Sequence, residues 1–104
     1  MQLARVIGTV VSEQKDPGLE GLKFLLLRNL NVENEEQSGY VVAVDAVGAG
    51  VGEVVMYATG SSARQTVLTQ NRPCDAVVMA IVDEWEVMGQ PHYRKTPSED
   101  PWAS

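Results

Sequence analysis

Three glycines alternate with small apolar residues at Gly48, Gly50 and Gly52, a pattern that could cradle the phosphates of a dinucleotide. A dinucleotide fingerprint needs another glycine three residues after the second, and Glu53 occupies that position. The residues that follow are expected to form a strand, whereas a bound pyrophosphate requires the N-terminus of a helix. The glycines therefore indicate a backbone path free of side chains, or a place where another chain approaches closely.

The segment Gly60-Ser61-Ser62-Ala63-Arg64 resembles half of the nucleophile elbow of serine hydrolases. Arg64 stands where the closing glycine of that motif is required. The single histidine, His92, lies in the C-terminal segment and is a poor candidate for the base that activates a serine. A helix capped by Ser61 or Ser62 is the simpler interpretation, and it leaves Arg64 to hold a carboxylate or carbonyl at a subunit contact or a pore mouth.

The remaining reactive side chains do not form a catalytic or metal-binding pattern. Cys74 has no second cysteine and no histidine at metal-ligand spacing. Carboxylates at strand ends cap turns or pair with Lys and Arg more often than they perform acid–base catalysis. Four are expected there: Asp45, Glu53, Asp75 and Asp83. The sequence thus predicts a protein that is not an enzyme and that carries no metal or cofactor.

Composition excludes several of the remaining functional classes. The chain has 104 residues with 14 acidic against 8 basic side chains, and this net charge of -6 argues against binding to phosphate backbones. Its 44% hydrophobic and 21% charged residues are ordinary for one small globular domain. The single cysteine fits a reducing compartment, and no apolar run approaches the roughly 20 residues that span a bilayer. We expect a cytoplasmic protein whose small core gains from burial against partner subunits.

Short β-branched segments separated by turn residues predict an all-β fold. The expected strands are 3–11, 22–30, 40–44, 53–58 and 76–87. Asp16-Pro17-Gly18 predicts a turn, the acidic stretch Asn31–Gly39 predicts a hairpin loop, and residues 60–66 predict one short helix. Five strands and one short helix favour a small five-stranded β-barrel, because closure removes exposed strand edges.

The C-terminal segment differs from the rest of the chain. Three prolines punctuate it, and no hydrophobic period is visible. We therefore predict a barrel domain over residues 1–88 and a mobile tail over residues 89–104. Tyr93 and Trp102 are the two residues of this tail that could anchor it, including to a neighbouring subunit.

Several segments taken together resemble a known family. They are 3–11, 15–23, 42–55, 60–64 and 75–83. The most specific feature is Val44-Asp45-Ala46-Val47-Gly48-Ala49-Gly50-Val51-Gly52-Glu53 followed by Gly60-Ser61-Ser62-Ala63-Arg64. In this order the segments resemble the EutN/CcmL family, the pentameric vertex proteins of bacterial microcompartments and carboxysomes. The resemblance covers residues 1–87.

The resemblance implies an OB-like β-barrel that assembles as a cyclic homopentamer. Such pentamers occupy the fivefold corners of an icosahedral shell, inside the cytoplasm, that is otherwise tiled by hexameric and pseudohexameric shell proteins. A flat hexagonal sheet cannot close, and fivefold units supply the curvature. The residues expected to pack closely at the subunit interface are Asp45, Gly48, Gly50, Gly52 and Glu53. The candidates to line a central pore are Ser61, Ser62, Ala63 and Arg64.

Two other functions compete with the structural one. An OB-type module for single-stranded nucleic acid or another ligand would use a basic groove and stacking aromatic side chains, yet the chain is acidic and has one phenylalanine, Phe24. A small enzyme would need a nucleophile with its base, or a ligand pocket lined by Asp45 or Glu53. The sequence favours the shell protein, without nucleic-acid or membrane partners.

Overall fold

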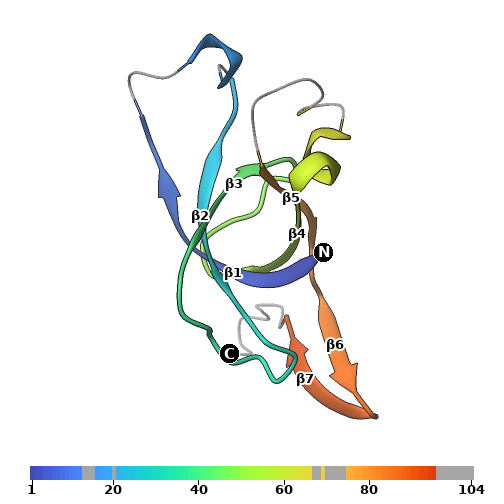
Figure 1. Ribbon diagram of the computed structural model, residues 1–104. Helices are drawn as coiled ribbons and strands as arrows, with labels where there is room; N and C mark the ends of the chain where they lie inside the picture. Colours follow the sequence, from blue (N-terminus) through green and yellow to red (C-terminus); the bar gives the residue numbers. More distant parts are fainter. Residues whose placement is uncertain (13–15, 20, 67–68, 70–74, 96–104) are drawn as a thin grey trace.

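The computed structural model describes residues 1–12, 16–19, 21–66, 69 and 75–95. Within these residues, five strands close into a barrel in the order β1-β2-β3-β5-β4 (Figure 1). The strands are β1 (Gln2–Val10), β2 (Phe24–Asn29), β3 (Val41–Asp45), β4 (Val54–Thr59) and β5 (Ala76–Ile81). The predicted all-β, five-stranded barrel is therefore confirmed, and its only helical elements in the described residues are the 3-10 turns η1 (Pro17–Leu19) and η2 (Gly60–Arg64).

Antiparallel pairing dominates the barrel, and one short parallel contact closes it. β1 pairs with β2 and β4, β2 pairs with β3, and β4 pairs with β5, all antiparallel. β3 and β5 run parallel and are in register only at Val44 with Val77 and Asp45 with Val78. The chain leaves this closing contact directly into the glycine-rich connection between β3 and β4.

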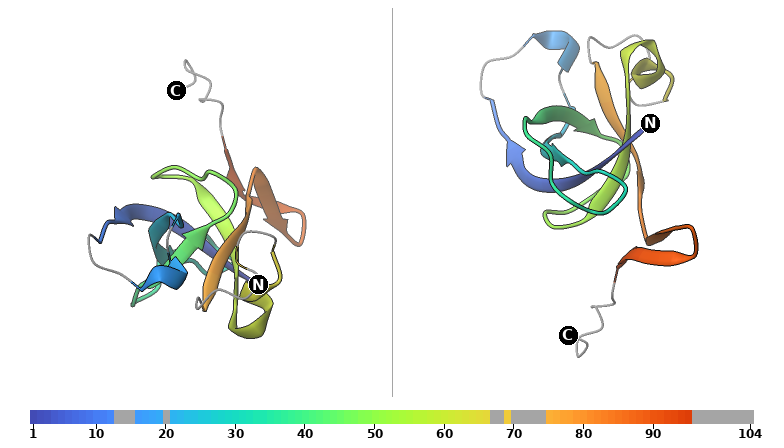
Figure 2. Two further views of the ribbon diagram at one scale, coloured as in Figure 1. Left: turned by 90° about the horizontal axis from the view of Figure 1, so that it is seen from above. Right: turned by 60° about the horizontal axis from the view of Figure 1, so that its bottom comes forward.

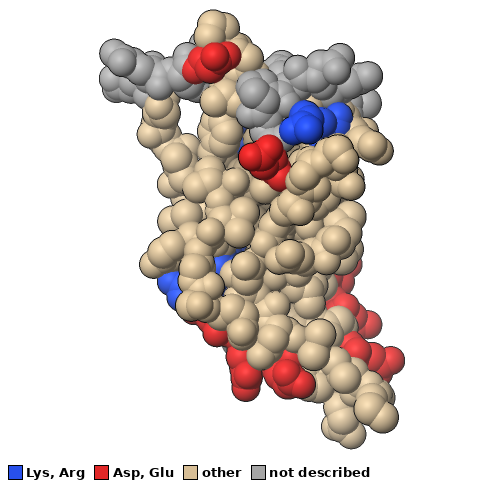
Figure 3. Space-filling view, viewed as in Figure 1, with Lys and Arg blue, Asp and Glu red and all other residues tan. Residues whose placement is uncertain are grey.

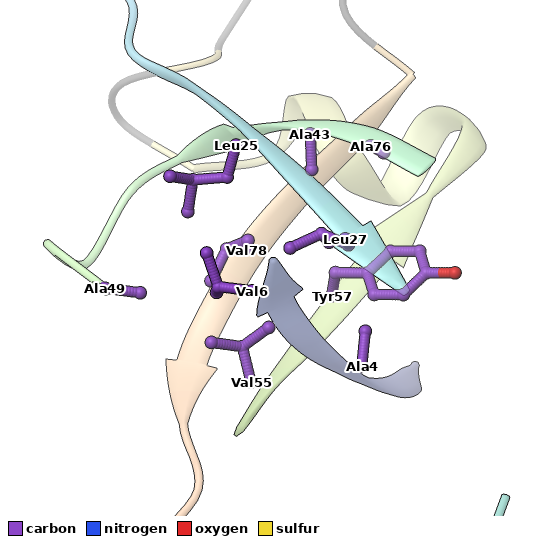
Figure 4. Close-up of a cluster of buried hydrophobic side chains, with 10 residues drawn as sticks. All are labelled: Ala4, Val6, Leu25, Leu27, Ala43, Ala49, Val55, Tyr57, Ala76 and Val78. Atoms are coloured by element: carbon purple, nitrogen blue, oxygen red, sulfur yellow. The ribbon is translucent and has the colours of Figure 1, made fainter. Parts of the chain in front are cut away.

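Alternate residues of the strands point into the barrel and form its main core (Figure 4). The buried members of this cluster are Ala4, Val6, Leu25, Leu27, Ala43, Ala49, Val55, Tyr57, Ala76 and Val78. Tyr57 is the one large aromatic side chain among them, as the low aromatic content of the chain leads one to expect. Its hydroxyl contacts the side-chain amide oxygens of Gln2 and Asn29, which satisfies the polar end of a buried ring.

The two predicted loops are held by their own side chains. Asp16 Oδ1 accepts the backbone N–H of Gly18 at 2.8 Å, which confirms the turn at the start of η1. Asn31 Oδ1 accepts the N–H groups of Glu33 and Glu35, both at 2.9 Å, in the hairpin loop between β2 and β3. Local Asx hydrogen bonds of this kind order a loop that composition alone describes only as polar.

The C-terminal part of the described chain differs from the prediction. The expected strand 76–87 is divided, because β5 ends at Ile81 and a separate hairpin of β6 (Glu84–Val87) and β7 (Gln90–Arg94) follows (Figure 2). The prediction of a mobile tail from residue 89 is thus wrong for residues 90–94, which pair with β6. Residues 96–104, with the predicted anchor Trp102, lie outside the described residues, as does Cys74.

A tight turn and an aromatic pair account for this hairpin. Met88 and Gly89 have φ values of 51° and 82°, the conformation of a two-residue hairpin turn. Trp85 and Tyr93 lie opposite each other, stack with ring centroids 5.3 Å apart, and pack against a minor core cluster around Val54. Burial of this pair against the barrel gives the two-stranded hairpin the stability that such a sheet lacks alone.

Candidate functional site

The connection between β3 and β4, residues 46–53 and here called the glycine loop, is organised by the last residue of β3. Asp45 is 6% exposed, and its carboxylate begins the loop. Its Oδ1 atom accepts the backbone N–H groups of Val47 (3.0 Å), Gly48 (2.9 Å) and Ala49 (3.3 Å). A carboxylate that accepts several amides fixes the backbone conformation strongly, because such bonds are charge-assisted. Asp45 is therefore a structural anchor of the loop within one chain.

The three glycines of the loop are present for different reasons. Gly48 and Gly52 have φ values of 78° and 96°, a conformation that disfavours any side chain. Gly50 lies outside that region, and a Cβ atom there would meet only Glu53 Oε1, at 3.7 Å. Within one chain, therefore, Gly48 and Gly52 are required by turns, whereas nothing in the described residues requires a glycine at position 50. Close packing of Gly50 against another chain stays a prediction.

Glu53 closes the loop from its other end. Its Oε1 atom accepts the backbone N–H of Gly50 at 2.6 Å, and its Oε2 atom lies 2.6 Å from Lys95 Nζ. The hydrogen bond from Lys95, and then that from Gly50, holds the pKa of the Glu53 carboxyl below its ordinary value of 4.5. The same contact raises the pKa of the Lys95 ammonium above 10.5. Glu53 is thus a bridging carboxylate between the loop and the end of β7.

The loop is also tied to β1, and it presents apolar side chains outward. The Gly52 N–H donates to Val6 O at 2.8 Å, and the Val6 N–H donates to Glu53 O at 2.9 Å. Val47 and Val51 remain 38% and 65% exposed. A backbone fixed at both ends that exposes two valines is a preorganised apolar surface.

The η2 turn positions the second group of predicted residues. Ser61, Ser62 and Arg64 are exposed, and Arg64 NH1 lies 3.7 Å from Asp75 Oδ1. Ala63 is fully buried in a cluster with Val77, so the prediction that its side chain lines a pore is wrong. The predicted serine cap is also wrong, because the N-cap residue is Thr59 and its side chain makes no capping hydrogen bond.

The two groups of predicted residues lie close together at the start of the glycine loop and far apart at its end. Glu53 precedes β4 and η2 follows it, so the six residues of β4 separate Glu53 from η2 by roughly 20 Å at about 3.3 Å per residue. The start of the loop lies near η2, because Ala46 packs against the cluster that contains Ala63. Figure 1 shows the connection running from the end of β3, which lies beside η2, across to the start of β4. The end of the glycine loop at Glu53 and the η2 turn are therefore distinct parts of one subunit, whereas the start of the loop adjoins η2.

Sequence reasoning missed the residues that brace the glycine loop from outside. Arg5 NH1 donates to Gly52 O at 3.2 Å, and Arg5 NH2 donates to Asn34 Oδ1 at 3.1 Å. Lys95 reaches Glu53 across 42 positions of sequence. The one sequence signal for Lys95 is the alternation of apolar and acidic residues around Trp85, which indicates a strand that continues into the hairpin near the barrel. Arg5 and Asn34 carry no such signal.

Neither a metal-binding cluster nor a membrane-spanning helix is found among the described residues. Across the described ranges, no three His, Cys, Asp or Glu side chains lie close enough together to hold a metal ion. No helix among the same residues has the length and hydropathy to cross a bilayer.

A closed five-stranded barrel with an anchored glycine loop before its fourth strand defines a class of small OB-like β-barrel proteins. The chain belongs to the EutN/CcmL family, since the family model described as "Ethanolamine utilisation protein EutN/carboxysome" matches residues 1–83. The expected family membership is therefore confirmed.

Individual relatives support the same family assignment. The chain is 47% identical over 95 residues to the carboxysome shell vertex protein CcmL of Gloeobacter violaceus, covering 91% of this chain and 95% of that protein. The solved structure of that CcmL matches with a TM-score of 0.88 over 91% of this chain and 98% of that chain. The bacterial microcompartment shell vertex protein PduN of Salmonella typhimurium is 51% identical over 87 residues, covering 80% of this chain and 96% of that protein.

A third relative bears on assembly. The solved structure of GrpN from Rhodospirillum rubrum, described as a pentameric microcompartment shell protein, matches with a TM-score of 0.78. It is 43% identical to this chain and covers 85% of this chain and 100% of that one. Both the barrel and its fivefold arrangement therefore occur in a protein of similar sequence.

Proposed function

We propose that this chain is a structural shell protein that forms the pentameric vertices of a bacterial microcompartment. The observation that carries the proposal is the similarity to the pentameric shell protein GrpN, which extends over 85% of this chain. The relatives named as shell vertex proteins support the same role. The chain then acts in the cytoplasm as part of the shell, and its function is geometric rather than catalytic.

A ring of five copies requires two different surfaces on each subunit, because a cyclic interface other than a dimer is heterologous. The glycine loop is one such surface. Its outer valines, Val47 and Val51, are apolar and exposed in the single chain. Asp45 Oδ2 is buried without a hydrogen-bond partner among the described residues, so a donor from a neighbouring copy would satisfy it. These features support the assignment of Asp45, Gly48, Gly50, Gly52 and Glu53 to the subunit interface.

The η2 turn is proposed to face the central opening of the ring. Ser61, Ser62 and Arg64 remain the candidates to line it, because their side chains are exposed on the turn that follows β4. Arg64 is the only charged residue of η2 and would set the charge of the opening.

The competing function, binding of single-stranded nucleic acid, gains no support from the surface. Figure 3 shows acidic side chains gathered at the end of the molecule that bears the β6–β7 hairpin. The exposed acidic residues of the β2–β3 loop, of β6 and of the residue before it are Glu33, Glu35, Glu36, Asp83, Glu84 and Glu86. Trp85 and Tyr93 stack on each other and on the barrel instead of offering free faces to bases.

The proposal is tested by shell closure. We expect coexpression of this chain with hexameric shell proteins of its own microcompartment to give closed polyhedral particles in electron micrographs. Omission of the chain is expected to leave open sheets, tubes or particles with unfilled corners. Particles that close equally well without the chain, and that never contain it, would contradict the proposed role.

A further inference from the structure

The β6–β7 hairpin is joined to the glycine loop by a residue that lies beyond the family match. The family model ends at residue 83, and Lys95 follows β7. The Lys95 backbone N–H donates to Asp83 O at 2.7 Å, which fixes the start of its side chain at the base of the hairpin. Its Nζ atom then reaches Glu53 Oε2 at 2.6 Å. The hairpin therefore ends in direct contact with the glycine loop.

Glu53 transmits this contact into the backbone of the loop. While Oε2 holds the lysine, Oε1 accepts the N–H of Gly50 at 2.6 Å. The Glu53 N–H donates in turn to Gly50 O at 3.1 Å. Since both carboxylate oxygens are engaged, the rotamer of Glu53 depends on Lys95 at one side and on the loop at the other.

A second chain of hydrogen bonds joins the same two parts of the molecule. Asn34 Nδ2 donates to His92 O of β7 at 3.2 Å, and Asn34 Oδ1 accepts from Arg5. Arg5 also donates to Gly52 O. The hairpin is thus connected to the glycine loop at Gly50 through Glu53, and at Gly52 through Arg5. Two independent connections to one short loop indicate that the hairpin braces it.

We infer that Lys95 is a positioning residue for ring assembly: it orients Glu53, which holds the Gly50 segment in the conformation that receives a neighbouring copy. This inference rests on the proposed function, in which the glycine loop is a subunit interface. It makes the β6–β7 hairpin part of the assembly apparatus. The side chains of the pair are 39% and 25% exposed, so its effect is modest and depends on salt.

Assembly of variants provides the first test. Lys95→Gln removes the ammonium, and Arg94→Gln is a matched control, because Arg94 is the adjacent cation and pairs with Glu84 away from the loop. We expect Lys95→Gln to raise the protein concentration at half assembly by about three- to five-fold, as loss of an exposed ion pair does. Arg94→Gln should leave it unchanged, and Lys95→Arg should restore most of the assembly.

Coupling to Glu53 distinguishes positioning from a general structural effect. If Lys95 acts through Glu53, the double variant Glu53→Gln/Lys95→Gln should assemble no worse than Glu53→Gln alone. Fully additive losses, or equal losses from Lys95→Gln and Arg94→Gln, would overturn the inference.

Measured well below the concentration of half assembly, where the chains are monomeric, the Gly50 amide reports on the loop independently of the ring. Lys95→Gln is expected to accelerate hydrogen exchange at Gly50 several-fold and to leave barrel amides of β1 and β4 unaffected. Unchanged exchange at Gly50 would refute positioning by Lys95 whatever the oligomeric state. A wild-type chain that stays monomeric, while Gly50 exchange still responds, would refute the proposed ring and with it the role of Lys95 in assembly.

Discussion

Two glycines of the same loop should respond differently to a side chain. Gly48 has a positive φ of 78°, so Gly48→Ala strains the backbone and is expected to lower the free energy of unfolding by about 1 kcal/mol. The Cβ atom of Gly50→Val meets only an ordinary contact with Glu53 and the backbone φ there is not positive, so the free energy of unfolding should change by less than about 0.5 kcal/mol. Ring formation should nevertheless fall, because a branched side chain would obstruct a neighbouring copy. Denaturant unfolding and native mass spectrometry measure the two effects.

The outcome shows whether position 50 matters for the fold of one chain or for contact with a neighbouring chain. A Gly50→Val variant with full pentamer yield would contradict the close-packing role of that position. A Gly50→Val variant that unfolds much more easily would show that position 50 is needed by the barrel itself.

The Glu53–Lys95 pair predicts how stability depends on pH. Because the pKa of Glu53 is lowered, its stabilising contribution is present above the unfolded value of 4.5 and is lost as the pH falls through the lower folded value. Because the pKa of Lys95 is raised, its contribution is present below 10.5 and is lost only as the pH rises through the higher folded value. Between these limits the pair is intact.

The measurement is the difference in unfolding free energy between wild type and Lys95→Gln, at one protein concentration, from pH 7 down to pH 3. This difference should be constant near neutrality and shrink below about pH 4.5, as the Glu53 carboxylate is protonated. Arg94→Gln controls for the general loss of a positive charge. A difference that stays constant throughout the acid range would contradict the proposed pairing.

At the residue scale, the sequence located the loop but not the contacts that shape it. The glycine spacing and the flanking Asp45 and Glu53 were recognisable as a unit. The three amides on Asp45 follow from turn geometry that spacing does not encode. The sequence predicts Ala63 to line a pore because the polarity of η2 does not reveal which side chain of a 3-10 turn faces the core. Lys95 was missed because its partner is distant in sequence.

At the element scale, the barrel strands were predictable and the hairpin was not. The short apolar segments, which are β-branched in β1, β3 and β4 and leucine-rich in β2, and the turn residues between them placed β1 to β4 within one or two residues. The break between β5 and β6 lacks glycine or proline, so the pattern continued through it. Pro91 argued against a strand, yet proline is tolerated because both strands of a two-stranded sheet are edges.

The aromatic pair should carry the stability of this hairpin. Trp85 stacks on Tyr93, packs on the barrel, and donates from Nε1 to Val32 O at 2.8 Å. Trp85→Ala should lower the free energy of unfolding by about 2 kcal/mol, below the roughly 3–5 kcal/mol of a fully buried aromatic side chain, because the ring is partly exposed. Met88→Ala at the 96% exposed turn is the control and should change it by less than about 0.5 kcal/mol.

Denaturant unfolding of both variants gives the values, and hydrogen exchange of β7 amides shows where the loss occurs. Equal stability of Trp85→Ala and wild type would contradict the role assigned to the stack. A Trp85→Ala variant that keeps β7 amides protected would contradict it equally.

At the scale of the whole molecule, physical reasoning from one chain identifies contact surfaces but not the number of chains in the assembly. The anchored glycine loop with exposed Val47 and Val51, and the η2 turn that follows β4, are the surfaces a cyclic assembly would use. Fivefold order itself depends on the angle between neighbouring subunits, which no single residue encodes. The number of five chains comes from relatives, and above all from the pentameric GrpN.

Native mass spectrometry of the purified chain at micromolar concentration tests the central claim most directly. The account predicts a dominant species of five times the 11.3 kDa of one chain. A sample that consists of single chains across that concentration range, or of a ring with another number of copies, would contradict it.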